Sequence, residues 1–187
     1  MLGQRHPNKG LGQVHDERAG PALPRPGQGV TVGVVSVPHT GTHAVMWALG
    51  WRQGVSFSPP RGATGKELAI VGHIWPPHDE APQYPRRYTA REWAELVQSD
   101  KDRLWFSPVR DPAQAAWSLR HVHGFSWERI RGCYSEFCDW VRSGVPRLVD
   151  IRGLTPQNVK GSGQRDEQLG AELLRDFPEA FGVYYGG

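Results

Sequence analysis

The chain has 187 residues, enough for one domain with a hydrophobic core. Its 22 Lys and Arg residues against 19 Asp and Glu give a net charge of +3, which is too small to predict nucleic-acid binding but suits a small anionic ligand. No stretch approaches the ~20 apolar residues of a membrane span, and no apolar signal core opens the chain, so we expect a cytoplasmic protein with neither nucleic acid nor membrane as partner.

Residues 1–29 are rich in Gly, Pro, Gln and charged side chains. Their aliphatic residues follow no period, so burial cannot offset the entropy that ordering would cost. We therefore expect a disordered or irregular arm over 1–29 and one α/β domain over 30–187.

Residues 30–49, which read VTVGVVSVPHTGTHAVMWAL, predict a buried strand, a tight turn and a helix. Pro38 ends the strand because proline cannot donate to a sheet. The helix pattern places Val45, Ala48 and Leu49 on one face. The turn between them directs backbone N–H groups toward one point, which indicates either an anion site or an ordinary strand–turn–helix junction.

Further strands and helices alternate along the rest of the chain. Short apolar runs predict strands at 54–58, 68–75, 103–109 and 146–151. Helical spacing predicts helices at 89–98, from Asp111 to near Gly124 with Val122 on the apolar face, from Ser126 to Gly144, and at 164–177. Cys138 lies on the apolar face of the third of these helices, and we expect it in the core.

This alternation predicts a three-layer α/β fold with a mainly parallel sheet. Ligands of such sheets bind at the carboxyl ends of the strands. The polar residues from His39 to His43 follow the first strand, His73 lies near the end of a later one, and Arg110 follows the strand at 103–109. We expect these residues to converge on one site.

The segment from Pro38 to His43, PHTGTH, lacks the lysine of a Walker-type P-loop, which disfavours a nucleotide triphosphatase or an ordinary kinase. It resembles the phosphosulfate loop of sulfotransferases, commonly P-[KR]-[ST]-G-T-[ST]. His39 stands where that family has Lys or Arg.

Two segments farther along continue the resemblance to sulfotransferases. Residues 107–112, SPVRDP, followed by Ser118, resemble the family's 3′-phosphate motif, in which a serine follows the arginine by eight positions. Residues 72–76, GHIWP, resemble the strand that carries the catalytic histidine. With residues 148–154, which resemble a later strand, the likeness spans 30–154.

The resemblance implies a short sulfotransferase-like variant of the P-loop fold. It also implies a nucleotide-binding transferase that uses 3′-phosphoadenosine 5′-phosphosulfate (PAPS) as donor, a small-molecule or glycan acceptor, and no metal ion. The implied catalytic residues are His73, as general base, and His39. The implied donor-binding residues are His39, Thr40, Gly41, Thr42, His43, Arg110 and Ser118.

Each candidate also has a purely structural alternative. Arg110 could pair with Asp111, Ser118 could pack within its helix, and His73 could be a hydrogen-bonded strand histidine. For the whole chain, the alternatives are a non-catalytic module that binds a nucleotide or another anion and, less favoured, a P-loop kinase. His39 and His43 form no complete metal site, because the spacing suggests no third ligand.

Overall fold

The computed structural model describes residues 31–38, 40–48, 55–57, 69–76, 88–151 and 163–184. The predicted arm over 1–29, and also His39 and Leu49, lie outside the described residues. In the described part of the chain the strands are β1 (Val32–Ser36), β2 (Val55–Phe57), β3 (Ala69–His73), β4 (Leu104–Val109) and β5 (Arg147–Asp150). The α-helices there are α1 (Thr42–Ala48), α2 (Ala90–Ser99), α3 (Pro112–Trp117), α4 (Trp127–Arg142) and α5 (Glu167–Asp176).

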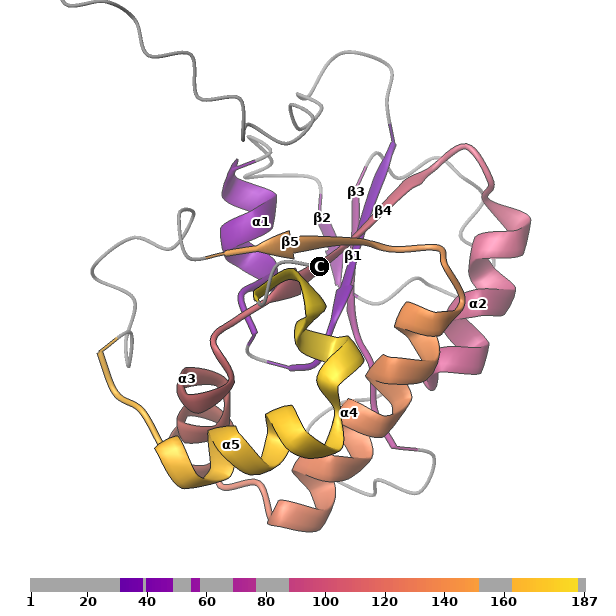
Figure 1. Cartoon of the computed structure of the whole chain (residues 1–187). Coiled ribbons are helices and arrows are strands. Elements are labelled where there is room, and N and C mark those ends of the chain that lie inside the picture. Colours follow the sequence, from indigo (N-terminus) through magenta and orange to yellow (C-terminus); the bar gives the residue numbers. More distant parts are fainter. Residues whose placement is uncertain are drawn as a thin grey trace, which may run out of the picture.

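The described strands form one parallel sheet in the order β2-β3-β1-β4-β5. Strand β1 is central, with Val32 paired to Ala69 on one side and to Leu104 on the other. Each predicted strand has its counterpart in the sheet, and the predicted α/β class is confirmed. The sheet with its flanking helices is shown in Figure 1.

Helices cover both faces of the sheet, which gives the predicted three layers. On one face, Val45 and Met46 of α1 pack with Val34, Val71 and Phe106. On the other face, a larger cluster joins the sheet to α2, α4 and α5. None of the helices in the described ranges is long and apolar enough to cross a lipid bilayer.

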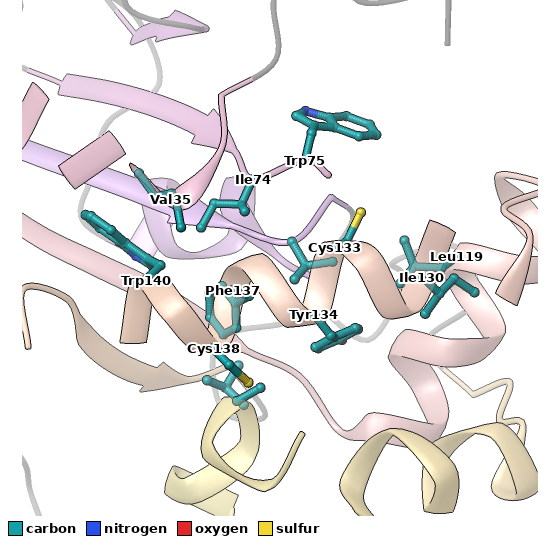
Figure 2. Packing of buried hydrophobic residues seen from close by; sticks show 14 of the residues in the cluster. Val35, Ile74, Trp75, Leu119, Ile130, Cys133, Tyr134, Phe137, Cys138 and Trp140 are labelled. Atoms are coloured by element: carbon teal, nitrogen blue, oxygen red, sulfur yellow. The ribbon is translucent and has the colours of Figure 1, made fainter. Parts of the chain in front are cut away.

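Helix α4 supplies much of the larger cluster. Its buried residues recur at helical spacing and are Ile130, Cys133, Tyr134, Phe137, Cys138 and Trp140. In Figure 2, Phe137 and Trp140 lie on the side of α4 that faces Val35 and Ile74. Cys138 is 1% exposed, so its predicted place in the core is confirmed.

Two helix-face predictions were wrong. Ala48, the last residue of α1, is exposed, although Val45 on the same face of the helix is buried against the sheet. Val122 is 39% exposed, because the chain changes at Ser118 from α3 to a π-helix (Ser118–Val122). The wider π turn shifts later side chains away from the α-helical spacing on which the prediction depended.

Candidate functional site

The direction in which successive strands are added to the sheet reverses beside β1. From β1 the chain continues to β2, on the β3 side of the sheet, whereas from β4 it continues to β5, on the opposite side. Ligands of open parallel sheets bind at the carboxyl ends of the strands that flank such a reversal. Those ends carry the turn after β1 and Arg110 after β4.

The turn after β1 requires glycine at position 41. Gly41 has a φ of 108°, in the region that side chains other than glycine rarely adopt. A Cβ atom there would also clash with the side chain of Ile151, which follows β5. The turn is therefore held by its backbone conformation and by packing against a distant part of the chain.

A serine joins the start of α1 to the end of β3. The Oγ atom of Ser36 lies 2.8 Å from Oγ1 of Thr42 and 3.5 Å from Nδ1 of His73. Ser36 is fully buried, Thr42 is 3% exposed and His73 is half-buried. Because β1 and β3 pair with Ser36 opposite His73, the sheet register itself brings the two side chains together.

Ser36 was missed in the sequence analysis. The signal was a polar residue that ends an otherwise apolar buried strand, directly before a turn rich in hydroxyl groups. Only the register with β3 shows that this hydroxyl reaches a histidine.

The hydroxyl of Thr40 has a structural partner. It donates to the carbonyl oxygen of Val37 at 2.7 Å, and the residue is 3% exposed. A threonine hydroxyl has one proton, so this bond leaves the backbone N–H as the donor that Thr40 could offer to an anion.

Arg110 lies close to Thr40 but is deeply buried. The residue is 6% exposed, and its Nε donates to Oε1 of Gln114 at 3.4 Å. Arg110, Thr40 and Val37 line a cavity of about 10 Å³, together with Phe137 and with Phe181 of a 3₁₀-helix (Pro178–Tyr184). That volume is of the order needed for a single water molecule.

The neighbouring Asp111 has a structural role. Its carboxylate caps α3 by accepting from the backbone N–H of Gln114 at 3.1 Å, and it forms an ion pair with Arg165 at 3.1 Å. Pro112 follows in the first turn of α3, where a proline is well tolerated.

The remaining candidates are placed separately. Ser118 is 6% exposed and stands at the junction of α3 and the π-helix. His39 lies outside the described residues, and so does the side chain of His43, so their roles stay predictions. Among the described residues, no three His, Cys, Asp or Glu side chains gather in a way that could hold a metal ion.

The structure therefore brings the candidates together in two groups. Thr42 and His73 meet through Ser36 on the β3 side of β1. Thr40 and Arg110 share a small cavity on the β4 side.

No protein family matches the chain, and no curated protein matches it. Among solved structures, the chain is similar to the crystal structure of the mouse sulfotransferase SULT7A1 complexed with PAP. The sequence identity is 13% and the TM-score 0.41, over 79% of this chain and 58% of that one. The chain thus spans less than two thirds of that protein's length, and a likeness of this size assigns no function to it.

Proposed function

We propose that the chain is a sulfotransferase that moves a sulfuryl group from PAPS to a hydroxyl or amine of a small-molecule or glycan acceptor. The observation that carries the proposal is the contact of Thr42 and His73 through Ser36. It lies at the carboxyl ends of the strands, where ligands of parallel α/β sheets bind. Thr42 and His73 come from two separate segments that each resemble a sulfotransferase motif.

In the proposed reaction, the acceptor oxygen or nitrogen attacks the sulfur atom of PAPS. A new bond to sulfur forms, and the bond between sulfur and the 5′-phosphate oxygen breaks, with its electron pair left on that oxygen. The acceptor proton passes to the imidazole of His73, which acts as general base. Donors of the turn after β1, the hydroxyl of Thr42 among them, stabilise the charge that develops on the leaving oxygen.

The residues present are of a kind that suits this donor. Thr42 offers a hydroxyl and Arg110 a guanidinium, and both groups donate hydrogen bonds to phosphate oxygens. We assign Arg110 and Ser118 to the 3′-phosphate. Because a phosphate is far larger than a cavity of about 10 Å³, binding at Arg110 requires the side chains that line this cavity, that of Phe181 among them, to move.

Calorimetric titration with 3′-phosphoadenosine 5′-phosphate (PAP), ATP and adenosine 5′-phosphate tests the donor assignment. We expect micromolar affinity for PAP and much weaker binding of the nucleotides without a 3′-phosphate. Arg110→Ala should weaken PAP binding about 10- to 100-fold, the size expected for a lost charged hydrogen bond. Arg91→Ala is the matched control, since the Arg91 side chain is 88% exposed and pairs with Glu95 on the surface of α2.

Undiminished PAP affinity in Arg110→Ala would remove Arg110 from the site, and no binding of PAP to the wild type would refute the proposed function.

Turnover is tested with His73→Gln over a panel of phenol, alcohol, amine and sugar acceptors. We expect activity to fall by about 10²-fold or more while PAP binding is retained. PAP binding without sulfate transfer to any acceptor would instead identify a nucleotide-binding module.

A further inference from the structure

Hydrogen bonds link Thr42 through Ser36 to His73, and the direction in which they donate determines which ring nitrogen of His73 carries the proton. Ser36 is fully buried and contacts both neighbours through a single oxygen atom, at 2.8 Å to Thr42 and 3.5 Å to His73. A serine hydroxyl has one proton and two lone pairs, so it can donate to only one of these two neighbours. When it donates to one neighbour and accepts from the other, the series of hydrogen bonds has two possible directions.

In the first direction, Thr42 donates to Ser36 and Ser36 donates to Nδ1 of His73. Nδ1 of the neutral ring is then an acceptor, and the ring proton is on Nε2. In this tautomer Nε2 cannot take a proton from an acceptor molecule.

In the second direction, Nδ1 of His73 carries the proton and donates to Ser36, and Ser36 donates to Thr42. The ring then has its lone pair on Nε2, where a general base needs it. The hydroxyl proton of Thr42 is directed away from Ser36 and is available to another acceptor.

An anion at Thr42 favours the second direction. A phosphate oxygen accepts hydrogen bonds and donates none when it is ionised, so Thr42 must turn its proton toward it. Thr42 can then only accept from Ser36, and Ser36 can then only accept from His73.

We propose, on the basis of the function proposed above, that Ser36 is a positioning residue that couples donor binding to the tautomer of His73. The 5′-phosphate group held at Thr42 reverses the chain of hydrogen bonds and places the ring proton on Nδ1. The base nitrogen Nε2 is thereby prepared when the donor is present.

The surroundings of His73 suit a role that depends on orientation. Its backbone carbonyl accepts from Nε1 of Trp93 at 3.2 Å, and its ring lies edge-on to Trp75, with 6.4 Å between ring centroids. The pairing of Ser36 with His73 across β1 and β3 sets the spacing of the two side chains. At 3.5 Å their hydrogen bond is long, as catalytic hydrogen bonds often are before a substrate tightens them.

The test is ¹⁵N NMR of the histidine ring nitrogens at mildly alkaline pH, where an imidazole is mostly neutral. The His73→Gln variant identifies the His73 signals, and PAP is the titrant. We expect saturating PAP to shift the His73 population toward the Nδ1–H tautomer in the wild type and in Thr42→Ser, which keeps the hydroxyl. The shift should disappear in Thr42→Val and in Ser36→Ala.

Ser107→Ala is the matched control. Ser107 is equally buried, one strand away on β4, and its hydroxyl donates to the carbonyl oxygen of Val35 at 2.7 Å, outside the chain from Thr42 to His73. This variant loses a buried serine hydroxyl but should keep the tautomer response. In turnover, Ser36→Ala should lower kcat about 10-fold with little change in KM for the donor, a smaller loss than removal of the base itself causes.

Two results would overturn the coupling while the proposed function stands: PAP binding with no change in the His73 tautomer of the wild type, or an unchanged response in Ser36→Ala. Absence of PAP binding to the wild type would refute both the coupling and the function on which it rests.

Discussion

Two buried polar side chains, Ser107 and Arg103, each form two hydrogen bonds. The hydroxyl of Ser107 donates to the carbonyl of Val35 and accepts from Nε1 of Trp140 at 2.9 Å. Arg103, 3% exposed, donates to Asp100 at 2.6 Å and to the carbonyl oxygen of Val32 at 3.0 Å. Because an unsatisfied buried polar group costs about 1–3 kcal/mol, each of these bonds lowers the cost of burying the two atoms that it joins.

The two cysteines should be unreactive in the folded protein. Cys133 and Cys138 are both buried, and burial raises the pKa of the Cys138 thiol to about 11. Thiolate is the reactive form, so we expect neither thiol to react with Ellman's reagent in the native protein near pH 8, and both to react in urea. Rapid labelling of Cys138 in the native protein would contradict this burial.

The same raised pKa makes stability depend on pH. The folded protein holds the thiol proton more tightly than the unfolded chain, so the contribution of Cys138 is present below about pH 9 and is lost as the pH rises toward 11. The free energy of unfolding should therefore fall over that range.

At the scale of elements, residues next to a helix end determine where the helix begins, whereas helix packing depends on residues far apart in the chain. Thr89 and Glu92 form a capping box at the start of α2, and Ser126 caps α4. The close approach of α5 to α3 has no such local signal. It depends on Gly170, where a Cβ atom would lie 2.5 Å from the Cα of Ala113.

Gly170→Ala should push α5 away from α3. Alanine would gain roughly 1 kcal/mol of helix propensity, but overpacking against the backbone costs about 1–3 kcal/mol, and here the neighbour cannot give way. We expect a net loss of stability in urea unfolding. Gly182→Ala is the control, since its Cβ would meet nothing within 4 Å; equal stability of the two variants would show that the contact is unimportant.

At the scale of the whole molecule, β1 is the middle strand of the described sheet. It pairs with β3 and β4 and is covered by helices on both faces, whereas β5 is at the β4 end of the described strand order and its residues are half-buried or exposed. The two candidate groups lie on either side of the carboxyl end of β1.

Backbone amides should exchange with solvent more slowly in the central strand β1 than in β5. Amides of β1 should exchange only through global unfolding, because their partners on both sides must separate first, while those of β5 should exchange through smaller openings. Mass spectrometry of peptides that cover the two strands gives the comparison. Equal exchange rates in β1 and β5 would contradict it.

The sequence by itself determined what depends on neighbours along the chain. Apolar runs and helical spacing predicted the strands and helices. The positions of Thr42, His73 and Arg110 at or after strand ends predicted that they lie at the carboxyl ends of the strands. These are local signals, which backbone geometry and burial of one face are enough to produce.

Only the tertiary structure decided the strand order, the contact of Ser36 with His73 and the burial of Arg110 beside a cavity that Phe181 also lines. The physical reason is that each depends on pairing or packing between segments far apart along the chain. A serine at the end of a buried strand gives the same sequence pattern in any strand register. An arginine after a strand gives the same pattern whichever distant segment packs against it.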